Sequence, residues 1–295
     1  MWRTPALALI AACSGAAVVA RAPAPAVPTA APPPAGLACL TRKLWSRVVA
    51  DDGTTTFDFS PDGRELAIAS GSPARVSIAG LANGRVRRSY VPEMGETVTA
   101  VLWRGDHVLA LHDGQSFTLL DAAHLAPVCS VRQYRHTYVP AGPLADPKRF
   151  ALLRDDDDAM FLDPVSCGFV PQASTPAEVA VRELGVEASA VAVSLDRRYV
   201  YIRTEGVRTY DATSGAPVES PPKDVRFAPD QVLRVERDGR HQLVNPATLE
   251  PRIRDLVGDP SRISPRGTYL VELDCGDAST STSCELAIHA VGACR

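Results

Sequence analysis

Histidines and carboxylates are the residues of this sequence whose types suit metal or acid–base chemistry. His107 and His112 lie five residues apart in the segment DHVLALHD, which has the apolar pattern of a β-strand. Strand side chains alternate between two faces, so residues at this spacing point in opposite directions and cannot reach one ion. We therefore expect His107 at a rim and His112 in a turn.

A run of four aspartates, Asp155 to Asp158, is the second candidate for metal binding. It lacks the alternating ligands, the glycine and the distal glutamate of a calcium loop. We interpret it as the solvated tip of a hairpin. The sequence also contains no Gly-x-Ser-x-Gly, Cys-x-x-Cys, His-Glu-x-x-His or phosphate-loop motif, so it predicts no catalytic residue, metal or cofactor.

Cys13 lies near the N-terminus, in the segment MWRTPALALIAACSG. An early arginine and a short apolar run precede it. This is the pattern of an export signal. The segment IAAC at residues 10–13 resembles the lipobox of bacterial lipoproteins, which implies a signal peptide over residues 1–13 and lipid attachment at Cys13. Ser14 then implies the outer membrane rather than the inner one. A secretory signal cleaved near ARAPA is the alternative, although a proline follows each Ala-x-Ala site there.

Six further cysteines suit an oxidising compartment outside the cytoplasm. If Cys275 faces Cys284 across an antiparallel pair, Leu273 faces Leu286 on the same side of the sheet. This apolar register predicts a disulfide between Cys275 and Cys284.

Composition excludes one class of partner and divides the chain. With 31 basic and 34 acidic residues among 295, the net charge of −3 offers no basic field for nucleic acid. Residues 14–36 are dominated by alanine and proline without apolar periodicity, which predicts an extended tether. Residues 37–295 remain as a single folded domain, long enough to bury a sizeable core.

Two kinds of turn recur along this domain, each about every 40 residues. The first resembles SPDGRE and is marked by Asp62, Gly105, Asp146, Asp196, Asp230 and Arg266. The second ends a strand in a small-residue corner and is marked by Gly80, Asp121, Asp163, Asp211, Asn245 and Val291. Short aliphatic and β-branched runs flank both kinds, which is typical of a β-propeller. We predict an all-β, six-bladed propeller in which the N-terminal strand LTRKLWSRVV completes the last blade.

The repeats also carry a family resemblance. FSPDGRELAIAS at residues 59–70 and TYDATSG at residues 209–215 resemble the WD40-like and TolB-type propeller repeats of bacterial envelope proteins. The resemblance covers roughly residues 40–295 and concerns the architecture, since the Trp-Asp dipeptide is absent. By analogy it implies binding to a partner protein of the envelope.

One interval between the repeats is longer than the others and contains STPAEVAVRELG. Thr175 and Glu178 form a capping box, Pro176 suits the first helical position, and Gly185 suits the position after the helix. We predict a short helix between the third and fourth blades. A strand formed by EVAV is the alternative.

The remaining cysteines can be placed in this ring. Cys39 begins the closing strand and Cys294 ends the strand beside it, which predicts a second disulfide. Cys129 and Cys167 each follow the corner of their own blade. For these two, a third disulfide and a pair of free buried thiols both remain open.

Partner recognition is expected on the face that gathers the loops entering the inner strands. The segment RQYRHTYVP lies there and supplies Tyr134, Arg135, His136 and Tyr138, which are residue types that carry interface energy. Packing of these side chains over neighbouring loops is the alternative reading.

The predicted function is a lipid-anchored, non-enzymatic propeller that binds or scaffolds envelope proteins. Its folded domain would lie in the periplasm or at the cell surface of a bacterium. The alternative is a propeller hydrolase or lyase with a site on the central axis, where Glu96, Glu187, Asp224 and Asp259 precede inner strands. Turn and solubility roles explain these four carboxylates equally well.

Overall fold

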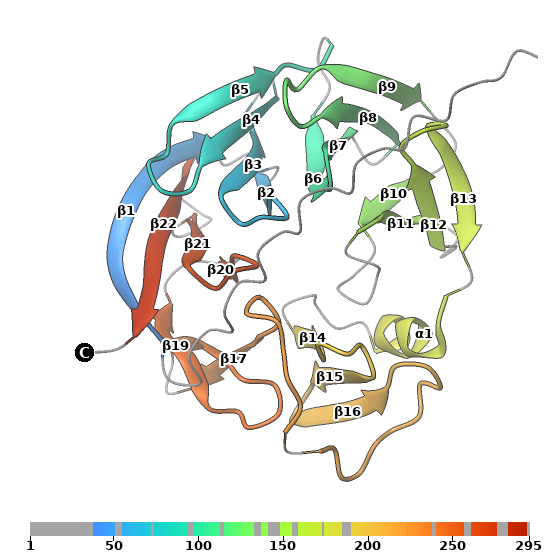
Figure 1. Cartoon of the computed structure of the whole chain (residues 1–295), viewed down its shortest axis with the longest axis vertical. Coiled ribbons are helices and arrows are strands. Elements are labelled where there is room, and N and C mark those ends of the chain that lie inside the picture. Colours follow the sequence, from blue (N-terminus) through green and yellow to red (C-terminus); the bar gives the residue numbers. More distant parts are fainter. Residues whose placement is uncertain are drawn as a thin grey trace, which may run out of the picture. The chain divides into compact units, whose positions relative to one another are not determined.

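The structure is a computed structural model that describes most of the chain after residue 37. The described ranges are 38–50, 55–71, 74–93, 97–112, 115–132, 137–140, 148–154, 159–172, 174–184, 190–222, 224–237, 240–256, 261–275 and 283–293. Six antiparallel sheets form the blades of a β-propeller (Figure 1). The predicted all-β, six-bladed fold is confirmed.

The strands follow the chain from blade to blade. Blades 1 and 2 contain β2 (Thr56–Phe59), β3 (Glu65–Ser70), β4 (Arg75–Gly80), β5 (Val86–Tyr90), β6 (Val98–Arg104), β7 (His107–His112), β8 (Ser116–Asp121) and β9 (Pro127–Arg132). Blades 3 and 4 contain β10 (Tyr138–Pro140), β11 (Phe150–Arg154), β12 (Ala159–Asp163), β13 (Gly168–Gln172), β14 (Val191–Val193), β15 (Tyr199–Arg203) and β16 (Val207–Asp211). Blades 5 and 6 contain β17 (Leu233–Arg237), β18 (Arg240–Val244), β19 (Pro251–Leu256), β20 (Ser261–Ile263), β21 (Tyr269–Asp274) and β22 (Ser283–Ala293).

The second strand of blade 1 is apolar on both faces because a neighbouring blade packs on each side. In β3, Leu66 and Ile68 belong to the cluster shared with blade 6. Ala67 and Ala69 belong to the cluster shared with blade 2. A strand in this position therefore needs a continuous apolar run such as ELAIAS. A strand with one face exposed to water would instead alternate apolar and polar residues.

The ring is closed by β1 (Ala38–Ala50), which pairs antiparallel with β22. The sheet order β1-β22-β21-β20 places the N-terminal strand on the outside of blade 6, and Figure 1 shows β1 in blue beside β22 in red. The pairing runs from Ala38 opposite Ala293 to Ala50 opposite Ser283. This confirms that the N-terminal strand completes the last blade.

Serine organises three of the turns that join the first and second strands of a blade. In blade 1 the N–H of Gly63 donates to the carbonyl oxygen of Ser60 at 2.8 Å, and the N–H of Glu65 donates to Ser60 Oγ at 2.9 Å. Ser194 and Ser264 accept the equivalent bonds in blades 4 and 6. The third residue after each serine has a left-handed φ, of 62° at Gly63, 56° at Arg197 and 69° at Gly267.

Aspartate or asparagine organises the corner between the third and fourth strands. The side-chain oxygens of Asp121, Asp163, Asp211 and Asn245 accept backbone N–H groups two or three residues further on. These are Asx-type turns, in which the side chain replaces a backbone acceptor. The recurrence of aspartate at these corners, used above as a sequence marker, therefore has a local hydrogen-bonding cause.

A short helix, α1 (Pro176–Glu183), lies between blades 3 and 4. The N–H of Glu178 donates to Thr175 Oγ1 at 3.2 Å, and the N–H of Thr175 donates to Glu178 Oε2 at 2.6 Å. These are the two bonds of a capping box. Ala177 and Val181 pack into the core of blade 4. The predicted helix is confirmed, and the alternative strand is excluded.

Blades 4 and 5 depart from the four-stranded pattern. Each has three strands in its sheet, β14-β15-β16 and β17-β18-β19. After β16 the chain makes one bridge, Tyr210 with Pro217, and then crosses to pair Phe227 with Ser194 of blade 4. The segment that precedes β17 is thereby held against the turn of blade 4, and this contact shapes the candidate site described below.

Substitution of Gly84 tests whether the closing strand packs on blade 1. Its φ is +67°, and a Cβ added there would lie 2.7 Å from Cδ2 of Trp45 in β1. Gly105 has a φ of +54°, but a Cβ there meets no described atom within 4 Å. We expect Gly105→Ala to lower the free energy of unfolding by about 1 kcal/mol through backbone strain alone. Gly84→Ala should lose about 1–3 kcal/mol more through overpacking.

Urea unfolding of the two variants beside the parent chain measures this difference. Equal losses for Gly84→Ala and Gly105→Ala would show that Trp45 does not pack on this turn.

Candidate functional site

A buried aspartate joins three blades beside the central axis. Asp58 lies in β2, the innermost strand of blade 1, and its side chain is 5% exposed. Its Oδ2 accepts from Arg104 Nη1 of β6 at 2.7 Å, and its Oδ1 accepts from Arg262 Nη2 of β20 at 3.0 Å. The backbone N–H of Trp103 adds a bond to Oδ2 at 2.9 Å. Blades 6, 1 and 2 are thus tied together through one carboxylate.

This cluster has the geometry of a structural ion pair. Arg262 also donates to the carbonyl oxygen of Phe57 at 3.0 Å, and its guanidinium lies 5.7 Å from the Phe57 ring and 5.8 Å from the Phe59 ring. A buried charge is tolerated when its lone pairs are filled by charged and backbone donors. Asp58 meets that condition, so its role is to hold neighbouring inner strands together.

A second carboxyl, Asp230, lies close to the same arginine. It belongs to the turn before β17, and its side chain is exposed to water. Desolvation by the surrounding protein nevertheless raises its pKa above the ordinary value of 3.8, and the charge of Asp58 acts in the same direction. The Arg262 guanidinium lowers the pKa but does not offset these effects.

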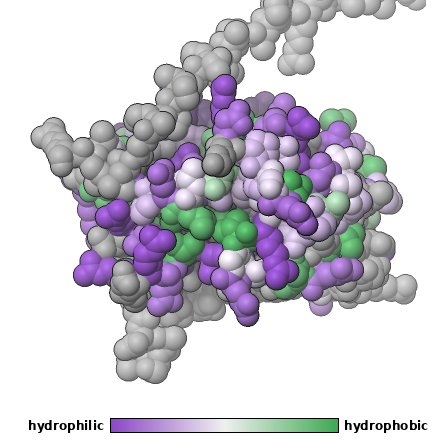
Figure 2. Space-filling model, turned by 90° about the horizontal axis from the view of Figure 1, so that it is seen from below, coloured by the Kyte–Doolittle hydropathy of each residue, from purple (hydrophilic) through white to green (hydrophobic). Residues whose placement is uncertain are grey.

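A pocket of about 460 Å³ opens between blades 4 and 5. Its lining comes from the turn of blade 4 and from the segment that leads to β17, and consists of Leu195, Asp196, Arg198, Tyr199, Pro222, Asp224, Val225 and Arg226. The N–H of Leu195 donates to the carbonyl oxygen of Arg226 at 2.8 Å, which fixes the two walls to each other. Figure 2 shows the molecule from the side of these blades, where an apolar patch lies among hydrophilic residues.

The pocket combines apolar and charged groups that are already oriented. Asp196 accepts from Ser194 Oγ at 2.6 Å and from the N–H of Arg198 at 3.1 Å, and these bonds lower its pKa. The guanidinium of Arg198 lies 5.8 Å from the ring of Tyr199. Leu195 is 60% exposed and supplies apolar surface at the pocket. An exposed leucine, an aromatic ring and fixed charges together suit recognition of a polypeptide.

The two histidines of β7 occupy different environments. His107 begins the strand and is half-buried, whereas His112 ends it and is 1% exposed. The Nε2 of His112 lies 3.0 Å from Thr118 Oγ1, which lies 3.1 Å from Ser130 Oγ. The carbonyl oxygen of His112 accepts the N–H of Gln115 at 3.0 Å, so His112 opens the turn as expected, while its side chain belongs to a polar network inside blade 2.

The predicted partner-binding group divides into two parts. Tyr138 is 3% exposed and stacks on Phe169 with ring centroids 4.7 Å apart, within the core between blades 2 and 3. Its ring is therefore a packing element, and we remove it from the partner-binding surface. Tyr134, Arg135 and His136 lie outside the described residues.

Two disulfides join cysteines in the described ranges. Cys275 at the end of β21 is joined to Cys284 in β22, within the predicted register of Leu273 opposite Leu286. Cys129 in β9 is joined to Cys167 in a corner of blade 3, with Cα atoms 6.4 Å apart, so neighbouring blades are linked covalently. Disulfide formation is thus the alternative that the structure favours for this pair.

The third predicted disulfide remains a prediction. Cys39 lies in β1 opposite Gly292, and Cys294 lies outside the described residues.

The carboxylates singled out in the sequence are dispersed. Asp224 lines the pocket, whereas Glu96, Glu187, Asp259 and the run from Asp155 to Asp158 fall outside the described residues. Within the described part of the chain, no three His, Cys, Asp or Glu side chains are placed to share a metal ion. No helix in the described ranges is long and apolar enough to cross a membrane.

Comparison with known proteins finds distant similarity in structure. No family model matches the sequence, and no curated protein matches it. The β-propeller domain of Cps50 (Swd1) from Myceliophteria thermophila is 15% identical with a TM-score of 0.40, over 78% of this chain and 82% of that chain. BamB from Moraxella catarrhalis is 13% identical with a TM-score of 0.41, over 80% of this chain and 81% of that chain.

Asp230 and Asp196 occupy matching turns and should have opposite effects on stability as pH changes. The raised pKa of Asp230 means that the folded chain holds its proton more tightly, so stability falls as pH rises above 3.8. The lowered pKa of Asp196 means that its contribution is present at neutral pH and lost as pH falls below 3.8. We expect Asp230→Asn to melt above the parent chain at neutral pH, and Asp196→Asn to melt below it.

Melting temperatures across a pH series check this pair. The Asp230→Asn difference should disappear as the pH falls below 3.8. The Asp196→Asn difference should begin to shrink below 3.8 and vanish only at the lower pH where the folded chain takes up this proton. A lower melting temperature for Asp230→Asn at neutral pH would contradict the placement of Asp230 in a desolvated setting.

Proposed function

We propose that this chain is a lipid-anchored, non-enzymatic propeller that binds another protein in the bacterial envelope. The pocket between blades 4 and 5 is the observation that carries the proposal. It offers the exposed Leu195 and the ring of Tyr199 within a frame of oriented charges. Interfaces of this composition place an apolar anchor at the centre and polar groups at the rim.

The cysteines support the choice of compartment. Disulfides persist in the periplasm and outside the cell, and they are rare in a reducing cytosol. The two bridges, Cys129–Cys167 and Cys275–Cys284, therefore agree with an exported protein. The IAAC sequence at residues 10–13 adds the proposed lipid at Cys13, with the outer membrane as the proposed location and the propeller in the periplasm or at the cell surface.

One observation favours the alternative of a hydrolase or lyase with an axial site. Burial raises the pKa of the Asp230 carboxyl, which also interacts with the charge of Arg262. Such groups occur at catalytic sites as well as in structural networks. A hydrolase or lyase activity that Asp230→Asn abolishes while the fold is retained would establish this alternative.

Substitution of Leu195 tests the binding proposal. Leu195→Asp places a charge at the centre of the pocket, and we expect it to reduce partner capture at least about tenfold, since such anchors dominate interface energy. Val165→Asp is the matched control, because Val165 is 93% exposed in a corner of blade 3. Both substitutions lie on the surface and should leave the melting temperature nearly unchanged.

The measurement is chemical crosslinking in intact envelopes, followed by purification of the full-length chain and mass spectrometry of what it carries. The same preparations report the mature N-terminus and any lipid on Cys13. Capture that survives Leu195→Asp, or that falls equally with Val165→Asp, would contradict the assignment of the pocket.

A further inference from the structure

Five arginines lie in the closing strand of blade 6 and in the corner and outer strand of blade 1. We call this group the seam patch, and its members are Arg42, Arg47, Arg85, Arg87 and Arg88. Two of them belong to the closing strand β1, and three belong to the corner and outer strand of blade 1. The patch therefore spans the point at which the ring closes.

The pairing of β1 places its two arginines toward blade 1. Arg42, Trp45 and Arg47 lie opposite residues 290, 288 and 286 of β22, which alternate by two and so share one face of the sheet. On that face Ile288 and Leu286 pack in the core between blades 6 and 1. Arg42 and Arg47 therefore point to the side of β1 that meets blade 1.

Direct bonds join this face to the corner of blade 1. Trp45 Nε1 donates to the carbonyl oxygen of Leu81 at 2.8 Å, and Arg47 Nη2 donates to the carbonyl oxygen of Gly84 at 3.2 Å. Arg85, the next residue, is exposed. Arg47 of β1 and Arg85 of blade 1 thus lie at the same turn.

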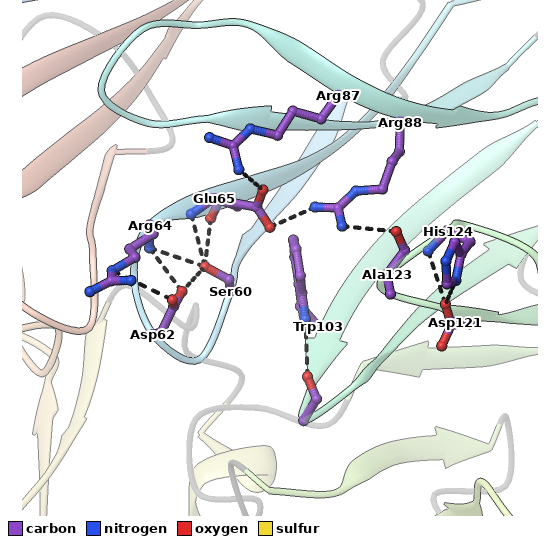
Figure 3. Close-up of polar contacts among 11 residues, drawn as sticks. Ser60, Asp62, Arg64, Glu65, Arg87, Arg88, Trp103, Asp121, Ala123 and His124 are labelled. Carbon is purple, nitrogen blue, oxygen red and sulfur yellow. Dashed lines mark hydrogen bonds and ion pairs between the residues drawn. The ribbon is translucent and has the colours of Figure 1, made fainter. Parts of the chain in front are cut away.

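The positive charge of the seam patch is only partly compensated. Glu65 accepts from Arg87 at 3.1 Å and from Arg88 at 2.7 Å, and Figure 3 shows both guanidinium groups at this carboxylate. Arg88 also donates to the carbonyl oxygen of Ala123 at 3.1 Å. Among the described residues, Glu65 is the carboxylate that pairs with this group, and it pairs with Arg87 and Arg88 alone, so the patch keeps an excess of positive charge although the chain has a net charge of −3. This separation of charge gives one part of the rim an attraction for anions.

We propose that the seam patch docks against an anionic lipid surface, with the arginines binding the phosphates of lipid headgroups. The inference rests on the proposed lipid anchor, because β1 is the described element that follows the N-terminal 37 residues, in which Cys13 lies. The anchor is therefore attached to the strand that carries Arg42 and Arg47. A lipid chain and a basic patch together give stable, oriented membrane contact.

Docking at this surface would orient the propeller. Figure 1 shows blade 4 across the ring from the seam between blades 6 and 1, so blade 4 would lie away from a membrane that contacts this seam. The pocket at Leu195 would then be directed away from the bilayer and open to a partner. Five arginines also attract acidic segments of proteins. The experiment below distinguishes an acidic protein segment from an anionic lipid surface.

Vesicle sedimentation of the full chain carrying Cys13→Ser tests the proposal without the lipid anchor. We expect this chain to sediment with vesicles of phosphatidylglycerol and phosphatidylethanolamine, but not with phosphatidylcholine alone. Binding should be strong at about 50 mM salt and lost at about 500 mM, because surface charges are then screened. Arg42→Glu and Arg85→Glu should each weaken binding about tenfold.

Arg208→Glu is the matched control, since Arg208 is exposed in β16 on another part of the rim. It should bind vesicles as the parent chain does, and melting temperatures of all variants verify the fold. Absence of binding to anionic vesicles overturns the proposal, as does an equal loss with Arg208→Glu. Binding of a poly-glutamate peptide in place of vesicles assigns the patch to an acidic protein instead. Capture through Leu195 is measured separately, so failure here leaves the proposed function standing.

Discussion

The pairing of β1 with β22 is the contact on which the rest of the structure depends. Blades of a propeller bury their apolar faces only against neighbours, so an open ring would leave two faces exposed to water. In the closed ring, Phe57 and Phe59 of blade 1 pack against Leu286 and Ile288 of blade 6 in one cluster. The pairing joins residues 38–50 to residues 283–293, and the entropy of closing such a long loop must be offset by this burial.

The charged groups near the axis are organised by the same closure. Arg262 reaches Asp58 only when blade 6 lies beside blade 1, and Arg104 then completes the cluster from blade 2. With Arg104 alone, Oδ1 of the buried Asp58 would lack its bond from a charged donor. The three inner strands are thereby fixed relative to one another. The pocket of blades 4 and 5 forms elsewhere on the ring, where the segment around Phe227 crosses to Ser194.

The fold was predictable because its signals are local and repeated. Turn residues recur with each blade, and the Thr175–Glu178 capping box marks the helix. The site was not predictable in the same way. The role of Asp58 depends on arginines far away in sequence, and its only local signal is a charge inside the apolar strand TFDF. Tyrosine is a residue type that is common at interfaces, but Tyr138 stacks on Phe169 and therefore lies in the core.

Disulfide mapping of the unreduced protein purified from the envelope tests the closed, exported ring most directly. The account predicts three bridges in peptide mass spectrometry, namely Cys129–Cys167, Cys275–Cys284 and Cys39–Cys294. The last of these would lock the ends of the paired strands β1 and β22 to each other. Cys39 joined to a cysteine other than Cys294, or free thiols at all six positions, would contradict the closure of the ring in an oxidising compartment.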